Sequence, residues 1–419
     1  MHALVAGGGI GGLAAALALH QKGVEVTVFE AVGELRPLGV GINLLPHAVT
    51  VLSGLGLLDA LSATGIETKE LVFFNKFGRE IWREPRGRAA GYDAPQLSIH
   101  RGELQFLLLK AAEARLGSDR LRFGMAYARH ETTPAGVRVW FRDMASGREV
   151  GPVAGDLLIG ADGIHSTVRR GFYPNEGLPR WSGALLWRAA IEDAPFLSGR
   201  SMIMAGHSRQ KLVVYPISKA ALDRGRSLTN WIAELRVGEP GDPPPSRENW
   251  NKPGDFDDFM PQFESWNFDW LDFPALARKT PSVLEFPMVD RDPVPAWTFG
   301  RATLLGDAAH PMYPVGSNGA SQAILDARAI AACLADGRGD VEGALKAYEA
   351  ERLPATSAIV QANRRQGPEE VMQIVEDRAP NGFDRLEDVI SREELETVAA
   401  KYKQVAGFDR ASVAKVARS

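Results

Sequence analysis

Residues 3–12 read Ala-Leu-Val-Ala-Gly-Gly-Gly-Ile-Gly-Gly, an apolar run that leads directly into a glycine-rich turn. The run predicts a buried strand at 3–6, and the Ala/Leu-rich segment 13–21 predicts a helix after the turn. Residues 24–29 predict a second strand, which ends at Glu30. A strand, a helix and a strand in this order predict an α/β fold with a parallel, Rossmann-like sheet covered on both faces.

The glycines follow the G-x-G-x-x-G spacing of a dinucleotide-binding turn. Gly7 permits the tight turn, Gly9 lets the backbone approach a pyrophosphate, and Gly12 lets the helix pack on the strand. Free N–H groups at the helix N-terminus favour that anion, and the carboxylate of Glu30 is suited to bind adenosine ribose. Such a turn also serves packing alone, and it does not distinguish NAD from FAD. The predicted cofactor contacts of this motif are Gly7, Gly9, Ile10, Gly11, Gly12, Glu30 and Ala31.

Composition argues against several other classes of protein. The chain has 419 residues and a net charge of −4, and it contains no run of five like charges that would indicate a nucleic-acid or membrane-binding patch. The single Cys333 cannot form an internal disulfide or a multi-cysteine metal site, and the eight histidines are scattered. The apolar stretch 3–19 is interrupted by five glycines, unlike a membrane span. We therefore expect a cytoplasmic protein without a bound metal.

Two further strand–turn motifs follow along the chain. Residues 156–163 read Asp-Leu-Leu-Ile-Gly-Ala-Asp-Gly, and residues 306–311 read Gly-Asp-Ala-Ala-His-Pro. The three motifs in this order resemble the class A flavoprotein aromatic monooxygenases, the para-hydroxybenzoate hydroxylase type. The resemblance implies FAD as cofactor and NADH or NADPH as transient co-substrate. The resemblance places Asp307 on the ribityl chain of FAD. It also implicates the motif around Asp162 in the binding of both FAD and NAD(P)H.

The same resemblance assigns further contacts to FAD. The loop 316–319 would aim backbone N–H groups and the positive end of the next helix at the flavin's pyrimidine edge, which becomes anionic on reduction. A surface ion pair remains the alternative for Arg36, and core packing for Met125. The contacts that the resemblance implies are Arg36, Leu38, Gly39, Val40, Arg101, Met125, Asp162, Gly306, Asp307, Gly316, Asn318 and Gly319.

Several stretches, among them 36–43, 98–105 and 313–326, resemble the branch of this family that acts on phenazine carboxylates. Ser317 stands where a glycine, and Asn318 where a glutamine, is common in the wider family. The resemblance implies hydroxylation of a planar aromatic or heteroaromatic ring by a flavin C4a-hydroperoxide. Where the hydroxylated carbon bears a carboxyl group, carbon dioxide would leave.

The amino-acid composition and the hydrophobic pattern of the chain change between the second and third motifs. Most tryptophans and several β-like runs, such as 211–217 and 282–288, predict a β-rich domain inserted into a discontinuous nucleotide-binding domain. The tail pattern fits either packing at the substrate entrance or a dimer contact, so monomer and homodimer both stay open. The predicted parts are an FAD-binding domain at 1–75, 97–178 and 285–364, a substrate domain at 76–96 and 179–284, a surface loop at 237–258, and a helical tail at 365–419 with helices near 368–378 and 391–404.

Flavin chemistry of this kind needs an apolar pocket that excludes water rather than a triad or a metal. Rings at Tyr215 and Tyr313 would sandwich a flat substrate, and Arg188 would pair with its carboxylate or with a surface acid. Core packing is the favoured reading for Trp187 and Met204. The pocket candidates are Trp187, Arg188, Met204, Tyr215, Tyr313, Pro314, Val315 and Gly316.

These patterns together predict an FAD-dependent monooxygenase that consumes NAD(P)H and O2, acts on a small aromatic substrate, and has no nucleic-acid or membrane partner. His310 is interpreted as orienting the loop at 306–307 rather than as a base, and no catalytic acid or base is assigned. Two alternatives stay open. One is an epoxidase or dehydrogenase on the same scaffold, and the other is a flavin-loaded sensor without turnover.

Overall fold

The glycine turn follows the carboxyl end of the middle strand of a five-stranded sheet. The computed structural model describes residues 1–35, 39–246, 249, 251–337 and 339–418. The strand order is β20-β12-β1-β2-β8, and all neighbouring pairs are parallel. The three motifs follow the carboxyl ends of three of these strands, which is where open α/β sheets bind ligands. The predicted Rossmann-like fold is confirmed. The strands are β1 (His2–Ala6), β2 (Glu25–Glu30), β8 (Leu121–Phe123), β12 (Leu157–Gly160) and β20 (Ala302–Leu304).

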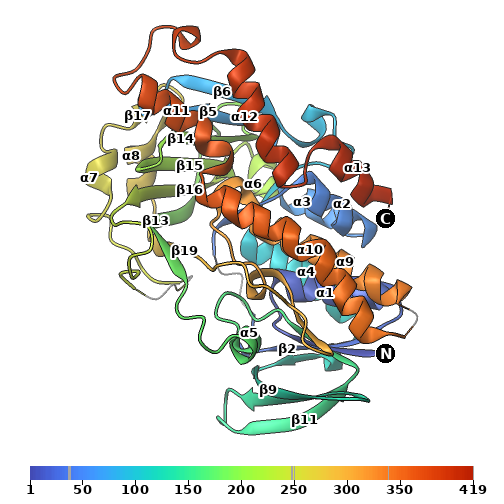
Figure 1. Cartoon of the computed structure of the whole chain (residues 1–419). Helices are drawn as coiled ribbons and strands as arrows, with labels where there is room; N and C mark the ends of the chain where they lie inside the picture. Colours follow the sequence, from blue (N-terminus) through green and yellow to red (C-terminus); the bar gives the residue numbers. More distant parts are fainter. Residues whose placement is uncertain (36–38, 247–248, 250, 338, 419) are drawn as a thin grey trace.

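Helices cover this sheet (Figure 1). The first, α1 (Ile10–Gln21), packs against both α4 (Arg101–Leu116) and α9 (Gly319–Asp336), and α9 in turn packs against α10 (Val341–Arg364). The Ala/Leu run of α1 is buried from Leu13 to Leu19, as expected for a helix that is apolar on all sides. A three-stranded antiparallel sheet extends from this part and consists of β9 (Met125–Thr133), β10 (Gly136–Asp143) and β11 (Glu149–Gly155).

A second sheet of seven strands has the order β19-β13-β16-β15-β14-β5-β6. Its outer face packs on an aromatic cluster that includes Trp187, Trp231 and Phe259, together with α7 (Met260–Phe263) and α8 (Phe273–Arg278). Its inner face turns toward the motif loops. The strands are β5 (Glu70–Phe74), β6 (Glu80–Pro85), β13 (Arg180–Asp193), β14 (Ser201–His207), β15 (Gln210–Pro216), β16 (Ser227–Arg236) and β19 (Leu284–Asp290).

The predicted domain boundaries cut this second sheet at two places. β5 pairs with β6 and β14, and β19 pairs with β13. We therefore propose that residues 70–75 and 285–290 belong to the inserted substrate domain rather than to the FAD-binding domain.

The tail folds back over the substrate sheet. It contains η5 (Gly367–Glu369), α11 (Glu370–Arg378), α12 (Arg392–Val405) and α13 (Arg410–Arg418), and α13 was not predicted. Val371, Met372 and Val375 pack with Met202 and Met204 of the sheet. No helix within the described ranges is both long and apolar enough to cross a membrane.

The remaining elements are short connections. The segment 237–258 carries neither a helix nor a strand among its described residues, as predicted. These connections are β3 (Gly41–Leu44), α2 (Pro46–Gly54), α3 (Leu58–Thr64), β4 (Ile66–Glu67), η1 (Gly87–Ala90), β7 (Leu97–His100), η2 (Ser118–Arg120), α5 (Thr167–Phe172), α6 (Lys219–Asp223), β17 (Asn267–Phe268), β18 (Leu271–Asp272), η3 (Gly306–Ala308), η4 (Val315–Ser317) and η6 (Leu386–Asp388).

Candidate active site

One large cavity, of about 320 Å³, lies between the motif loops and the inner face of the seven-stranded sheet. Arg36 and Leu38 lie outside the described residues. The predicted site residues that line the cavity are Gly9, Ile10, Gly11, Gly39, Val40, Arg101, Arg188, Met204, Tyr215, Gly306, Asp307, Pro314, Val315, Asn318 and Gly319. Those that do not line it are Gly7, Gly12, Glu30, Ala31, Met125, Asp162, Trp187, Tyr313 and Gly316.

The glycine turn has the geometry that its spacing predicts. A Cβ at Gly7, whose φ is +113°, would lie 2.2 Å from the carbonyl oxygen of Ala161, and one at Gly12 would lie 2.0 Å from that of Gly7. A Cβ at Gly9 would instead have no atom within 4 Å. Gly7 and Gly12 thus serve close packing, whereas Gly9 leaves open space at the start of α1 for a ligand.

The carboxylate of Glu30 lies at the outer side of this turn. Its Oε2 accepts a hydrogen bond of 2.6 Å from the backbone N–H of Gly8, and its Oε1 accepts one of 3.0 Å from that of Val32. Glu30 therefore fixes the shape of the turn from outside the cavity.

Two helix N-termini open onto the same cavity. Neither α1, capped by Gly9, nor α9, capped by Asn318, has a side-chain cap or an acidic residue in its first turn. A Cβ at Gly319 would also have no atom within 4 Å. Uncapped N–H groups and the helix dipole favour negative charge at both places. These two open cradles fit the pyrophosphate and the pyrimidine edge of FAD.

Asp307 lies on the cavity floor between the two helix ends. Surrounding atoms desolvate its carboxylate and raise its pKa, while His310 and Arg101 pull the pKa down. Burial lowers the pKa of the Arg101 guanidinium, and Asp307 raises it. The pair places an acid that is exposed to the cavity and a half-buried cation on the wall where the resemblance expects the ribityl chain.

A buried carboxylate behind the floor holds this loop in place. Asp326 accepts hydrogen bonds from the backbone N–H of Gly306 at 3.1 Å and from Nε of Arg352 at 2.7 Å, and its Oδ2 lies 2.6 Å from Nε2 of His310. These partners hold the pKa of Asp326 at about 2 despite its burial. His310 therefore orients the loop, in line with its interpretation from sequence, while the roles of Asp326 and Arg352 were not predicted.

The second motif contributes backbone rather than a carboxylate. Ala161, Gly163 and Ile164 line the cavity, whereas the Asp162 carboxylate accepts hydrogen bonds from the N–H groups of Thr167 at 2.7 Å and Val168 at 3.2 Å. The Asp162 side chain thus satisfies the first two N–H groups of α5, and Ser166, the N-cap residue, accepts from the N–H of Arg169. Met125 begins β9 away from the cavity.

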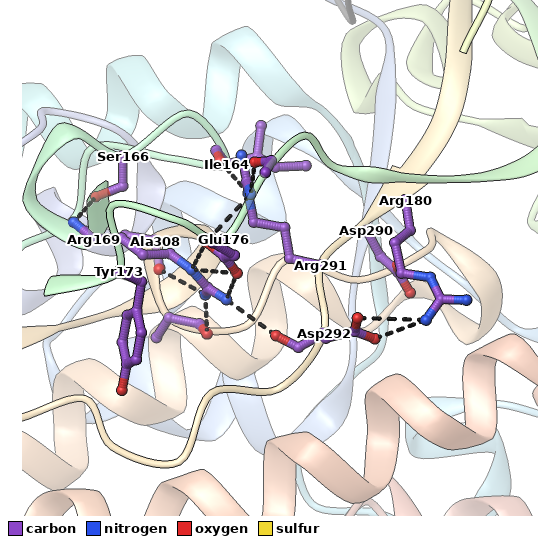
Figure 2. Close-up of polar contacts among 12 residues, drawn as sticks. Ile164, Ser166, Arg169, Tyr173, Glu176, Arg180, Asp290, Arg291, Asp292 and Ala308 are labelled. Carbon is purple, nitrogen blue, oxygen red and sulfur yellow. Dashed lines mark hydrogen bonds and ion pairs between the residues drawn. The ribbon is translucent and has the colours of Figure 1, made fainter. Parts of the chain in front are cut away.

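Arg169 of the same motif ties the second and third motifs together (Figure 2). Its buried guanidinium donates hydrogen bonds to the carbonyl oxygens of Ala308 at 3.1 Å and Ala309 at 2.7 Å, and it forms an ion pair with Glu176. Arg291 donates from Nε to the carbonyl oxygen of Ile164 at 3.0 Å. These contacts fix the loops after β12 and β20 relative to each other.

The loop at 314–319 turns its tightest residue away from the cavity. Gly316 has a φ of +68°, and a Cβ there would lie 2.0 Å from the Tyr402 hydroxyl of the tail. The Nδ2 of Asn318 donates a hydrogen bond of 2.7 Å to that hydroxyl. Gly316 is therefore needed for the approach of the tail, and its neighbours Val315, Ser317 and Asn318 line the cavity.

Strand alternation sorts the substrate-pocket candidates. Leu186 and Arg188 face the cavity, so Trp187 between them points to the outer face and lies 5.2 Å from the ring of Phe259. Trp187 therefore lies in the outer core, which is the reading favoured from sequence, and does not line the cavity. Met204, for which core packing was the favoured reading, does line the cavity.

Only one of the two tyrosines predicted to sandwich a flat substrate lines the cavity. Tyr215 lines the cavity and packs on Gly41, where a Cβ would lie 2.5 Å from its ring. Tyr313 instead packs with Leu186 and Met288, and its carbonyl oxygen accepts a hydrogen bond from Asn363. The proline that follows it turns the chain back toward the cavity, so Pro314 rather than Tyr313 reaches the lining.

Arg188 is a buried cation in an apolar wall. Its guanidinium lies 4.8 Å from the ring centroid of Phe286, and burial and the nearby charge of Arg101 lower its pKa. Arg188 therefore places a positive charge within an apolar part of the cavity wall, an arrangement that suits a flat ligand with an anionic group.

Comparison with known proteins agrees with this site. The family model of the FAD binding domain matches residues 1–177 and 285–363. The chain is 49% identical over 365 residues to a phenazine 1,6-dicarboxylic acid hydroxylase, PhzS, from Lysobacter antibioticus, covering 86% of this chain and 88% of that protein. It is 33% identical over 370 residues to a 3-amino-4-hydroxybenzoate 2-monooxygenase from Streptomyces cremeus, covering 86% and 85%.

A solved salicylate hydroxylase–substrate complex has the same fold, with a TM-score of 0.75, 22% identity, and coverage of 100% of this chain and 98% of that one. The open cradles at Gly9 and Gly319 and the acid on the cavity floor fit the cofactor that the family model implies. The chain therefore belongs to the class A family built on this FAD-binding domain, and it is a flavin-dependent monooxygenase with FAD as its cofactor.

Proposed function

We propose that the chain uses NAD(P)H and O2 to hydroxylate a small planar aromatic carboxylate of the phenazine carboxylate kind. The observation that carries this proposal is the buried Arg188 guanidinium within an apolar wall that includes Leu186, Met204 and Phe286. A carboxylate bound there would form a charge-assisted pair in a low-dielectric site and would restore the charged form that burial disfavours.

The residues present can hold both cofactor and substrate. The N–H groups at Gly9 and Gly11 would bind the pyrophosphate, Asp307 would accept hydrogen bonds from ribityl hydroxyls, and the start of α9 at Gly319 would face the pyrimidine edge. When bound, FAD would supply the redox chemistry by which NAD(P)H activates O2 for transfer of one oxygen atom to the ring. The apolar wall excludes water from the site, and Arg188 orients the ring by its carboxylate so that one edge faces the flavin loop.

The substrate class is supported by the activity for which the 49% identical relative is named and by the stretches that resemble 5-methylphenazine-1-carboxylate 1-monooxygenase. Hydroxylation at the carboxyl-bearing carbon would replace the carboxyl group and release carbon dioxide. Hydroxylation at another carbon would keep it.

The test is turnover by purified, FAD-loaded protein. NADH or NADPH oxidation and O2 uptake are followed with and without phenazine-1-carboxylate and its N-methyl derivative, and the product mass is measured. We expect ligand-dependent oxidation with one oxygen atom recovered in the product. Oxidation without incorporated oxygen would favour a dehydrogenase instead, and a flavin that no ligand makes reducible would favour a sensor.

A further inference from the structure

Three buried charged side chains form one cluster on the cavity wall, which we call the acidic triad: Lys211, Glu234 and Glu369. Lys211 of β15 and Glu234 of β16 are register partners, and Nζ of Lys211 lies 2.9 Å from Oε2 of Glu234. Glu369, from η5 of the tail, forms a second ion pair with the same ammonium. The three residues are only 5%, 7% and 7% exposed, and all line the cavity.

The triad does not offer a positive charge to a ligand. One ammonium faces two carboxylates, so the fully ionised cluster carries one negative charge, and uptake of one proton makes it neutral. Burial and the neighbouring Glu234 raise the pKa of Glu369, while Lys211 pulls it down. The two glutamates raise the pKa of Lys211, which stays charged and is neutralised within the triad.

The strand register places Lys211 and Glu234 two residues along the strands from the position of Arg188. Arg188 is opposite Ile232, which is opposite Val213, and Glu234 and Lys211 lie two residues further along these strands. Two residues of β-strand span about 7 Å. The inner face of the sheet thus presents a cation at one position and an acidic cluster at the next.

We propose that the acidic triad is a specificity determinant that rejects a second carboxylate on the substrate, so that this chain prefers aromatic monocarboxylates to dicarboxylates. The inference rests on the proposed function, because it takes the first carboxylate to lie at Arg188. A second carboxylate on the opposite ring would then lie beside Glu234 and Glu369. Repulsion between this second carboxylate and the glutamates of the triad, in a partly buried site, weakens the binding of the dicarboxylate about 10-fold or more.

The 49% identical protein is named for a phenazine dicarboxylic acid. In the present chain, the tail delivers Glu369 to the wall and so determines how that edge of the substrate is recognised.

The test compares the binding of phenazine-1-carboxylate and phenazine-1,6-dicarboxylate to the FAD-loaded protein by equilibrium dialysis. We expect the monocarboxylate to bind about 10-fold or more tightly than the dicarboxylate. Glu369→Gln keeps the side-chain shape and leaves Lys211 paired with Glu234, so the variant should fold. It should reduce the ratio of the dissociation constants for the dicarboxylate and the monocarboxylate several-fold. Glu234→Gln gives an independent second variant with the same expected direction.

Glu376→Gln is the matched control, because Glu376 lies on the same tail and pairs with Lys76 at 2.6 Å outside the cavity lining. It should leave the ratio unchanged. Equal or tighter binding of the dicarboxylate by the unmodified protein, or an unchanged ratio in both triad variants, would overturn the inference and leave the proposed function standing. Failure of both ligands to bind would instead remove the proposed substrate class and the inference with it.

Discussion

The hydroxyl of Tyr402 accepts a hydrogen bond of 2.7 Å from Nδ2 of Asn318, and so joins the C-terminal tail to the loop that begins α9. The same hydroxyl donates to Oδ1 of Asn363 at 2.8 Å, and no side chain larger than hydrogen fits beside it at Gly316. Tyr402 is 4% exposed, so these partners have little access to water. The tail therefore supports the cavity-lining loop at 314–319, rather than merely covering the sheet.

Tyr402→Phe should weaken FAD binding. The change keeps the ring but leaves the amide of Asn318 and the Oδ1 of Asn363 without this partner, at a cost of about 1–3 kcal/mol. The dissociation constant for FAD and the thermal unfolding of the apoprotein check it. Tyr92→Phe is the control, since the Tyr92 hydroxyl donates to the carbonyl oxygen of Phe408, also on the tail, without reaching the loop. Equal loss of FAD affinity in both variants would show that the tail acts only through general stability.

Asp307→Ala should lower FAD retention or slow flavin reduction. The carboxylate lines the cavity, and its loss removes a partner for the charge of Arg101 and the acceptor that we propose for ribityl hydroxyls. Removing a hydrogen bond to a charged group costs about 1.5–3 kcal/mol, or roughly 10- to 100-fold in affinity. Flavin content after gel filtration and the rate of anaerobic reduction by NAD(P)H measure the two effects. A fully active variant with normal flavin content would exclude Asp307 from the site.

Arg188→Met should lower the affinity for an aromatic carboxylate by about 10- to 100-fold and should affect the corresponding primary amide much less, because the charge-assisted pair is lost while the apolar wall stays. Ligand titrations with phenazine-1-carboxylate and its carboxamide measure both affinities. Equal losses of affinity for the acid and the amide would mean that Arg188 shapes the pocket and does not bind the carboxylate.

Local patterns predicted the parts of the site that depend on local geometry. The glycine turn and the strand ends before Gly163 and Gly306 follow from spacing and strand–turn chemistry. The orientation of Trp187 does not, because β13 is apolar on both faces and alternation alone does not say which face meets the cavity. Lys211 and Glu234 could have been identified from sequence as candidate site residues, since charged residues interrupt otherwise apolar strands at these positions. The role of Tyr402 could not have been predicted from sequence, because this residue lies 84 residues from Asn318 on an ordinary amphipathic helix.

Asp326→Asn should lower the free energy of unfolding by about 3–5 kcal/mol, because it leaves Arg352 and His310 buried beside a neutral amide. The folded pKa of Asp326 is about 2 and its ordinary value is 3.8. Its contribution to stability is therefore complete above about pH 5 and is lost as the pH falls toward 2. Urea unfolding of both proteins between pH 7 and about pH 3 should show a difference that shrinks on acidification. A difference that stays constant, or grows at low pH, would contradict the ionised state of Asp326.

Tyr215→Ala should uncouple the reaction without emptying the flavin site. The ring lines the cavity and packs on Gly41, so its loss opens the apolar wall to water and should raise the share of reducing equivalents released as hydrogen peroxide. Truncating a buried aromatic also costs about 3–5 kcal/mol of stability, so the ratio of peroxide to hydroxylated product is measured well below the unfolding temperature and alongside FAD content. Trp187→Phe is the control, because it trims a buried ring on the opposite face of the same sheet and should reduce stability while leaving the ratio unchanged. Equal coupling in the Tyr215→Ala and unmodified proteins would remove Tyr215 from the group of residues that shield the flavin.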